Sequence, residues 1–311
     1  MMKRILVSAP PMLQIIEELD LESKSMGLEL IKAEVTQTLS ESQLIKLLPD
    51  FDGWIIGDDP GTFKVFEAAK KGNLKAAVKW GIGVDNIDFQ ACRELGIPIT
   101  NTPGMFGNEV ADLALAYLIG LSRNILIIDK NVRKGKWIKP QGISLEGKKV
   151  ALIGYGDIGK NVALRLNVIG MKVIAYDPNI NENELLEGSR LSTWPLGIEE
   201  ADYLLITCAL NKQTFHLINE DIFLKMKKGI RIINVSRGQI INQKDLIKAL
   251  KNEIVHSAAL DVFEEEPLPI DSELLNYEDC IFGSHNASNT KEAVLKTSKK
   301  AIKLLREFLE N

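Results

Sequence analysis

The sequence predicts an α/β protein with two doubly wound parallel-sheet domains. Its 311 residues are enough for two ordinary domains, and 45% hydrophobic with 26% charged residues is the composition of a soluble globular protein. Short β-branched runs alternate with amphipathic stretches in two successive series, which is the pattern of parallel sheets flanked by helices. No run of about 18 apolar residues occurs, so we expect no membrane span and no membrane partner.

The first series covers residues 1 to about 100 and alternates strands with helices. The expected strands are Ile5–Val7, Leu28–Val35, Gly53–Ile56, Ala76–Lys79 and Ile97–Thr100. The expected helices are Met12–Ser25, Ser40–Leu48, Thr62–Lys71 and Asn86–Leu95. Ser40, Thr62 and Asp85 are the expected N-caps, because their side chains can accept a hydrogen bond from the first helical turn.

The second series follows a linker at residues 134–142 that is rich in charge and turn-forming residues. The expected strands are Lys149–Ile153, Lys172–Tyr176, Tyr203–Thr207, Arg231–Asn234, Ser257–Leu260 and Asp279–Phe282. Between the two series, Asn108–Asn131 reads as a helix that is apolar nearly all round, and therefore buried between domains or in a subunit interface. The last helix, Lys291–Leu309, needs a sheet face to cover, so we expect it to return to the N-terminal domain.

Charge and cysteine content narrow the possible partners. The net charge of −4 arises from 38 basic and 42 acidic residues without any basic block, which disfavours nucleic acid as a partner. Cys92, Cys208 and Cys280 are few and far apart, so they are expected to be reduced thiols of a cytoplasmic protein. Their spacing indicates neither a disulfide framework nor a metal site. The apolar stretch at the N-terminus breaks at Pro10, too early for a signal sequence.

A glycine motif indicates dinucleotide binding. Gly154, Gly156 and Gly159 follow one expected strand and open the expected helix Lys160–Gly170, which is the context that this motif requires. The first glycine permits the tight turn, the second lets the backbone approach the pyrophosphate, and the third allows close packing of helix on strand. The helix N-terminus then presents N–H groups to the phosphates, with backbone contributed by Asp157 and Ile158.

Asp177 gives the motif its specificity. It ends the next expected strand, 18 residues after Gly159, where an acid hydrogen-bonds the adenosine ribose and repels a 2′-phosphate. Pro178 and Asn179 follow, with no arginine to receive such a phosphate, so NAD is favoured over NADP. The alternative interpretation is that Asp177 only forms the turn before Pro178.

Three ionisable residues follow the last three expected strands. Arg237, Glu266 and His285 should therefore meet at the carboxyl edge of the sheet, where open α/β sheets bind ligands. A guanidinium can fork onto a carboxylate, an imidazolium can supply a proton, and a nearby carboxylate can keep that imidazole protonated. Beside a dinucleotide site, this combination predicts hydride transfer involving an anionic 2-oxo acid.

Over nearly its whole length the sequence resembles the D-isomer-specific 2-hydroxyacid dehydrogenases. The motifs that carry the resemblance are residues 79–88 (KWGIGVDNID), 101–103 (NTP), the glycine motif, 235–238 (VSRG), 261–263 (DVF), Glu266-Pro267 and His285. The resemblance implies a Rossmann NAD-binding domain, residues 101–287, inserted into a flavodoxin-like substrate-binding domain formed by residues 1–100 and 288–311. It also implies a homodimer.

The resemblance implies a role for each site residue. Arg237 should clamp the substrate carboxylate and 2-oxo oxygen, His285 should act as proton donor and acceptor, and Glu266 should raise the pKa of His285. Asp261 should contact the nicotinamide side of the cofactor, and backbone at Cys208 and Val235 should line its cleft. The backbone of Gly81, Ile82 and Gly83 should bind the substrate carboxylate. Lys79 is either a solvated strand end or an attractor of a second anionic group on the substrate.

The identity of the substrate stays open, and the sequence departs from the family pattern at two places. A 3-phosphoglycerate dehydrogenase-like activity is preferred, with hydroxypyruvate or glyoxylate reduction as the close alternative. An NAD-sensing, corepressor-like binding protein is the alternative from another class. Formate dehydrogenase is disfavoured because its histidine pairs with glutamine, whereas this chain has Glu266. Gly283-Ser284 stands where the family commonly has Thr-Pro, and Asp112 where glutamate is usual.

Overall fold

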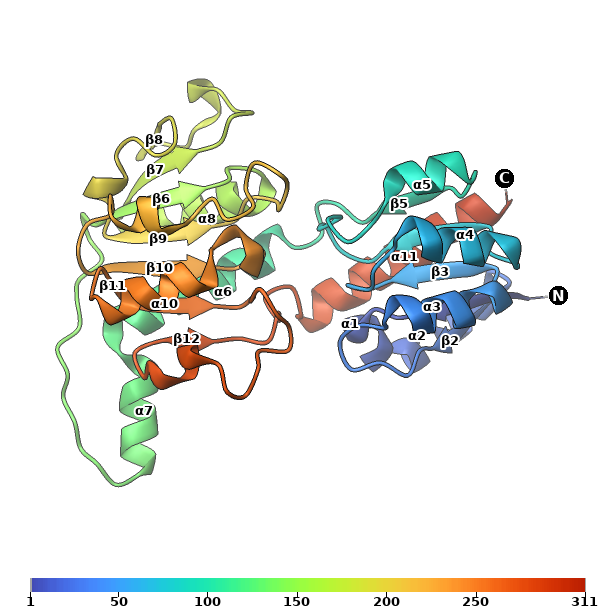
Figure 1. Ribbon diagram of the computed structural model, residues 1–311, viewed down its shortest axis with the longest axis horizontal. Helices are drawn as coiled ribbons and strands as arrows, with labels where there is room; N and C mark the ends of the chain where they lie inside the picture. Colours follow the sequence, from blue (N-terminus) through green and yellow to red (C-terminus); the bar gives the residue numbers. More distant parts are fainter. Residues whose placement is uncertain (1, 311) are drawn as a thin grey trace. The chain divides into compact units, whose positions relative to one another are not determined.

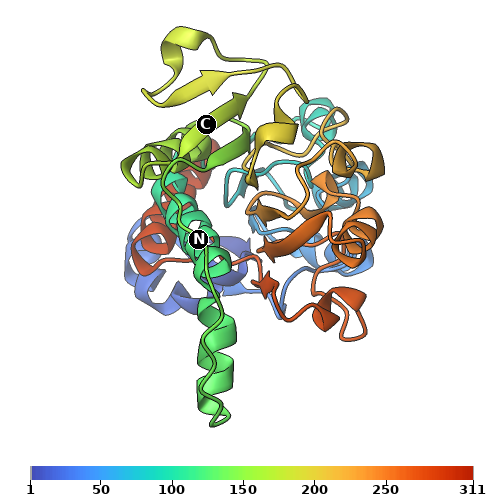
Figure 2. The same ribbon diagram turned by 90° about the vertical axis from the view of Figure 1, so that its left-hand side faces the viewer.

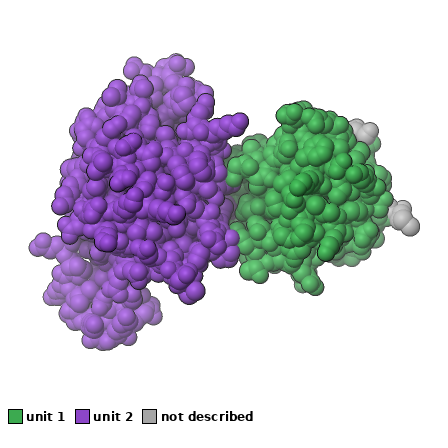
Figure 3. Space-filling model, viewed as in Figure 1, with its two compact units in different colours: residues 1–106, 289–311 green, residues 107–288 purple. Residues whose placement is uncertain are grey.

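The structure, a computed structural model, describes residues 2–310 and separates into two compact units. One unit comprises residues 1–106 and 289–311, and the other residues 107–288 (Figure 3). Both are built on purely parallel sheets flanked by helices (Figure 1). Among the described residues no single helix is long and apolar enough to cross a membrane, although two consecutive helices, Gly107–Arg123 and Ile125–Arg133, pass that test together with a 66° bend.

The sheet of the first unit has the strand order β2-β1-β3-β4-β5. Its strands are β1 (Lys3–Val7), β2 (Leu28–Lys32), β3 (Gly53–Ile56), β4 (Ala76–Lys79) and β5 (Ile99–Asn101). Its helices are α1 (Pro10–Gln14), α2 (Ile16–Ser25), α3 (Glu41–Leu47), the 3-10 turn η1 (Leu48–Asp50), α4 (Phe63–Lys71), α5 (Phe89–Glu94) and α11 (Lys291–Glu310). This strand order is that of the flavodoxin-like doubly wound fold.

The C-terminal helix belongs to this first unit. α11 packs against β3 and β4, and its buried residues include Val294, Ile302 and Leu305. A separate apolar cluster contains Leu44 of α3, Phe66 of α4 and the sheet residue Trp54. The sheet is therefore covered by chain segments from both ends of the sequence, and the predicted return of the last helix is confirmed.

Several predicted boundaries in the first unit were wrong. The expected helix Met12–Ser25 is broken at Ile15, whose φ of −117° and ψ of 11° are not helical and whose N–H donates to the Met12 carbonyl. The cap of α5 is Asp88, which accepts from the Ala91 N–H at 2.8 Å, and not Asp85. The caps Ser40 and Thr62 are confirmed.

The sheet of the second unit has the order β12-β11-β10-β9-β6-β7-β8. Its strands are β6 (Lys149–Ile153), β7 (Lys172–Tyr176), β8 (Ser189–Leu191), β9 (Tyr203–Ile206), β10 (Ile230–Asn234), β11 (Val255–Leu260) and β12 (Ile281–Phe282). Its helices are α6 (Gly107–Arg123), α7 (Ile125–Arg133), α8 (Asp157–Val168), α9 (Glu220–Phe223) and α10 (Gln243–Lys251). Short 3-10 turns are η2 (Glu182–Glu184), η3 (Ile198–Glu200), η4 (Gly238–Ile240) and η5 (Glu273–Asn276).

This strand order is the Rossmann order, read from β8 inward and extended by one strand beyond β11. Helices α6 and α8 pack on each other, with α6 also against β10, β11 and β12, while α10 packs against β11 (Figures 1 and 2). Because every strand is parallel, the loops after β6, β7, β9, β10, β11 and β12 leave from one edge of the sheet. All the expected cofactor-binding and catalytic residues of this unit follow those strands.

Two features of the second unit differ from expectation. The sequence predicted six strands, and the structure adds β8 as a seventh, paired with β7. The single helix predicted at Asn108–Asn131 is two helices, because Asn124 adopts a left-handed conformation with φ 54°. α6 is largely buried, whereas none of the residues of α7 is.

Candidate active site

The glycine loop after β6 has the shape that a dinucleotide pyrophosphate requires. Gly154 has φ 92°, and a Cβ there would lie 2.6 Å from the Cys208 nitrogen on the neighbouring loop. A Cβ on Gly159 would overlap the Gly154 carbonyl oxygen. At Gly156, the N-cap of α8, an added Cβ would meet nothing within 4 Å, so the helix N-terminus is open to an approaching group.

Two further residues fix this loop. Thr207 at the end of β9 donates its hydroxyl to the Gly154 carbonyl at 2.8 Å, a contact that sequence reasoning missed. Asp177 accepts from the Tyr155 N–H at 2.8 Å and from the Asn179 N–H at 2.9 Å. The carboxylate of Asp177 therefore both supports the glycine loop and forms the turn after β7, so the ribose-binding and turn-forming interpretations are compatible.

The first turn of α8 carries Asp157 and Ile158. Asp157 is exposed, and its carboxylate lies 2.6 Å from the position that a Cβ on Gly107 would occupy. The N–H groups of this turn have no partners within the helix, which is the donor set that binds phosphate. The open glycine loop, the free helix terminus and the acid after β7 together fit a dinucleotide.

Cys208 and Val235 follow β9 and β10 on the same edge. Val235 is 7% exposed, and the Ser236 hydroxyl donates to the Cys208 carbonyl, which ties the two loops together. Burial raises the pKa of the Cys208 thiol to about 12, so this thiol stays protonated near neutral pH and is not a nucleophile.

Arg237 lies in a loop that is held by its own neighbours. The buried Asn234 side chain donates to the Arg237 carbonyl at 2.9 Å and accepts from the Ser236 N–H at 3.1 Å. The Arg237 guanidinium donates through Nη1 to the Ser236 carbonyl at 2.8 Å. Gly238 follows, and a Cβ there would overlap the Phe263 carbonyl group, so only glycine lets the Arg237 loop approach the loop after β11.

Glu266 and His285 form a hydrogen-bonded pair. His285 Nδ1 lies 2.8 Å from Glu266 Oε2, and the side chains are 24% and 22% exposed. The other Glu266 oxygen accepts from the Phe263 N–H at 2.9 Å, which fixes the carboxylate. Because Nδ1 faces Glu266, a proton exchanged with a ligand would have to pass through Nε2, the other ring nitrogen. His285 itself has a left-handed backbone, with φ 54°.

Asp261 is placed differently from the other site residues. It is completely buried, and its carboxylate accepts from the Tyr117 hydroxyl at 3.1 Å and from the Ala287 N–H at 2.8 Å. Tyr117 is a residue that sequence reasoning missed, because its position within an apolar helix indicated only a core residue. Glu264, two residues before Glu266, pairs with His216 at 2.8 Å.

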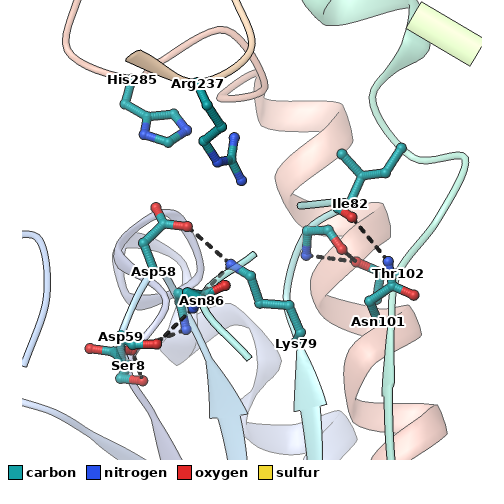
Figure 4. A network of polar contacts seen from close by, with 12 residues as sticks. Ser8, Asp58, Asp59, Lys79, Ile82, Asn86, Asn101, Thr102, Arg237 and His285 are labelled. Carbon is teal, nitrogen blue, oxygen red and sulfur yellow. Dashed lines mark hydrogen bonds and ion pairs between the residues drawn. The ribbon is translucent and has the colours of Figure 1, made fainter. Parts of the chain in front are cut away.

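The expected substrate residues of the first unit lie at the end of β4 and in the loop that follows it (Figure 4). Lys79 is only 3% exposed, and its Nζ donates to the Gly57 carbonyl at 2.6 Å and to Asp58 Oδ1 at 3.0 Å. It is therefore not a solvated strand end. The Gly81 N–H donates to the Thr102 hydroxyl at 2.8 Å, and the Ile82 carbonyl accepts from Asn101 at 3.1 Å. Ile82 itself is 40% exposed, and Gly83, which follows it, is partly buried.

Comparison with known proteins decides the family. A sequence model described as "D-isomer specific 2-hydroxyacid dehydrogenase, NAD binding domain" matches residues 115–287. The chain belongs to this family. The D-2-hydroxyacid dehydrogenase assignment and the choice of NAD are thereby confirmed at the level of the family, together with the fold class.

Two curated relatives and one solved structure illustrate what the chain is similar to. The chain is 36% identical to chloroplastic D-3-phosphoglycerate dehydrogenase 2 of Arabidopsis thaliana, over 91% of this chain and 46% of that protein. It is 36% identical to hydroxypyruvate reductase of Thermotoga maritima, over 89% of this chain and 91% of that one. The solved structure of NAD-dependent formate dehydrogenase from Staphylococcus aureus, in complex with NAD, superposes with a TM-score of 0.85 at 27% identity, covering 98% and 95% of the two chains.

Proposed function

We propose that this protein is an NAD-dependent reductase of a short 2-oxo acid, forming the D-2-hydroxy acid, with the reverse oxidation available. The observation that carries the proposal is the 2.8 Å pair of His285 and Glu266, which follows β12 and β11 on the sheet edge that also carries Arg237. A second histidine–carboxylate pair, His216 and Glu264, joins the segment just before α9 to the loop after β11, and its histidine does not directly follow a strand.

Each residue of the pair has a defined task in this proposal. Bound NADH supplies the hydride to the 2-oxo carbon. His285 Nε2 donates the proton that the 2-oxo oxygen takes up, and it accepts that proton in the reverse direction. Glu266 fixes the ring through Nδ1 and favours the charged imidazolium. Arg237 binds the substrate carboxylate, for which a planar guanidinium is suited.

We further propose that residues 154–159, Asp177 and the backbone at Cys208 and Val235 bind NAD. For the first unit, we propose substrate binding through Lys79 and through the backbone of Ile82 and Gly83. The Gly81 N–H contributes less than expected, because it donates to the Thr102 hydroxyl. We place the protein in the cytoplasm as a homodimer, with the exposed apolar residues of α7 supporting self-association.

One contact favours an unphosphorylated substrate over 3-phosphoglycerate. The Lys79 ammonium pairs with the Asp58 carboxylate at 3.0 Å and donates to the Gly57 carbonyl. The negative charge of Asp58 therefore offsets most of the attraction that Lys79 would exert on a phosphate group. Asp59, the other acid of this loop, is completely buried and bonded to Ser8, Leu39 and Gly57. We therefore propose hydroxypyruvate or glyoxylate as substrate, with 3-phosphohydroxypyruvate as the second candidate.

Steady-state kinetics test this assignment. We expect kcat/KM with NADH to be at least about tenfold higher for hydroxypyruvate or glyoxylate than for 3-phosphohydroxypyruvate, the discrimination produced by about 1.4 kcal/mol. NADPH should be the poorer cofactor, because Asp177 would repel its 2′-phosphate. Turnover that is fastest with 3-phosphohydroxypyruvate would reverse the substrate order. Tight NADH binding without turnover of any 2-oxo acid would favour the NAD-sensing alternative.

A further inference from the structure

Gly283 occupies a position where no other residue fits beside Tyr117. A Cβ built on Gly283 would overlap both the Tyr117 hydroxyl and Asp261 Oδ1. The glycine thus leaves room for a tyrosine hydroxyl directly before the loop that carries His285. The sequence departs from its family pattern at this position, and the structure shows which side chain uses the resulting space.

The Tyr117 hydroxyl donates its hydrogen bond to the carboxylate of Asp261. Tyr117 comes from the middle of α6, is 9% exposed, and donates to Asp261 Oδ1 at 3.1 Å. Burial, and next the nearby Asp261 carboxylate, raise the pKa of Tyr117 well above its ordinary value, so the hydroxyl keeps its proton and remains a donor. Without this donor, one oxygen of a completely buried carboxylate would lose its hydrogen-bond partner.

Asp261 in turn holds the backbone on both sides of the His285 side chain. Its main-chain carbonyl accepts from the His285 N–H at 2.7 Å, and its carboxylate oxygen Oδ2 accepts from the Ala287 N–H at 2.8 Å. The Gly283 N–H donates to the neighbouring Leu260 carbonyl at 2.8 Å. Residues 283–287 are therefore anchored to the end of β11 at three consecutive points.

The anchors matter because His285 has an unfavourable backbone. Its φ of 54° lies in the left-handed region, which is unfavourable for a residue with a Cβ and persists only where the surroundings impose it. Relaxation of this residue to an ordinary conformation would turn its imidazole away from Glu266. The contacts made by Asp261 oppose that relaxation.

We propose that Tyr117 is a positioning residue for the reaction, which acts through Asp261 to hold His285 in its productive conformation, and that Gly283 is present to admit its hydroxyl. The proposal rests on the reductase function proposed above. It assigns Asp261 to the support of the histidine loop, in which both carboxylate oxygens are engaged within the protein.

The first test removes only the hydroxyl. We expect Tyr117→Phe to lower kcat for the 2-oxo acid about tenfold, because a hydrogen bond to a charged group is lost, while KM changes little since the Arg237 clamp is intact. The matched control is Tyr203→Phe, because the buried Tyr203 hydroxyl bonds Ser122 of the same helix at 2.7 Å but does not touch Asp261. Tyr203→Phe should keep the wild-type kcat.

Hydrogen–deuterium exchange gives a readout that does not depend on turnover. In the cofactor-free protein, the peptide containing residues 283–288 should exchange about tenfold faster in Tyr117→Phe than in wild type or Tyr203→Phe. Faster exchange without any 2-oxo acid turnover in the wild type would contradict the reductase function and leave the structural link intact. Unchanged exchange and unchanged kcat in Tyr117→Phe would overturn the proposal.

A double substitution tests the steric half of the proposal. Gly283→Ala alone should reduce kcat more than Tyr117→Phe does, because the added Cβ would overlap both the Tyr117 hydroxyl and the Asp261 carboxylate. Tyr117→Phe with Gly283→Ala should lose less than the product of the two single effects, since the methyl group then meets only the Asp261 carboxylate, which no longer has a tyrosine donor to hold it in place. Fully multiplicative losses would show that Gly283 and Tyr117 are independent and would contradict the pairing.

Discussion

Asp59 is a carboxylate that organises a loop of the first unit from a completely buried position. It accepts a hydrogen bond from the Ser8 hydroxyl at 2.5 Å (Figure 4). It also accepts from the Leu39 N–H at 2.7 Å and the Gly57 N–H at 3.2 Å. The Ser8 hydroxyl also accepts from the Trp54 indole at 2.8 Å. Through these contacts Asp59 joins the loops after β1 and β3, and Asn86 also donates to its carbonyl at 2.6 Å.

Burial predicts how Asp59 affects stability as the pH changes. Desolvation raises the pKa of Asp59 in the folded protein above its ordinary value of 3.8, although its three donors partly oppose the shift. The folded protein then binds the proton more tightly, so the contribution of Asp59 to the free energy of unfolding falls as the pH rises from 3.8 through the folded pKa.

The comparison with Asp59→Asn isolates this effect, because asparagine has no proton to titrate. We expect the variant to be less stable by about 1–3 kcal/mol near neutral pH. The asparagine side chain has an NH₂ group in place of one carboxylate oxygen, and that group would face N–H and O–H groups that are themselves donors. The stability difference between wild type and variant should be larger at low pH. Urea denaturation of both proteins at a series of pH values from 3.8 upward measures this difference in the free energy of unfolding. A difference that grows with pH would show that burial is not the main influence on the pKa of Asp59.

Single residues also mark what sequence reasoning could and could not find. Arg237, Glu266 and His285 were predicted to share one sheet edge because each follows a recognisable strand. Tyr117 was not, because its partner Asp261 is 144 residues away and nothing local distinguishes a hydrogen-bonded tyrosine from a core aromatic. The cap of α5 was misplaced for a related reason, as Asp85 and Asp88 are equally good caps and only tertiary structure selects Asp88.

Among the secondary-structure elements, the helices around Asn124 depart most from expectation. Apolar residues continue through residues 108–131, so the sequence indicated one helix. In the structure Asn124 has a positive φ, and the two helices on either side of it meet at an angle of 66°. Asparagine is among the few residues that adopt this conformation readily, yet asparagine within a helix usually remains helical. β8 escaped detection because its three residues include no fully buried side chain and therefore show no strand pattern.

α7 is the element that we expect to mediate self-association. Ile125, Leu126 and Val132 are 47%, 52% and 44% exposed, and Trp137 just beyond the helix is 80% exposed. Leu126→Asp should convert a wild-type dimer into a monomer in sedimentation velocity, because an interface would then bury an unpaired charge. Leu164→Asp, at an equally exposed leucine of α8 (51%), should remain a dimer. A monomeric wild type, or a dimeric Leu126→Asp, would exclude this role for α7.

For the whole molecule, the strand orders explain why the sequence was so informative about the fold. Parallel strands joined by right-handed crossovers leave few possible orders, and both observed orders are the common ones for doubly wound sheets. Once the order is known, all residues after the strands share one edge, so linear motifs become a site. Substrate choice does not follow from this logic, because the Lys79–Asp58 contact links the end of β4 to the loop after β3, and no motif marks that loop.

In the proposed reaction, His285 supplies the proton for reduction of a 2-oxo acid. The most direct measurement is kcat for NADH-dependent reduction of hydroxypyruvate by His285→Ala, beside His216→Ala as a matched control, since His216 makes an equivalent 2.8 Å contact with Glu264. We predict that His285→Ala lowers kcat roughly 10²–10⁴-fold with NADH binding retained, the usual contribution of a general acid, while His216→Ala stays active. Full turnover by His285→Ala would contradict the mechanism.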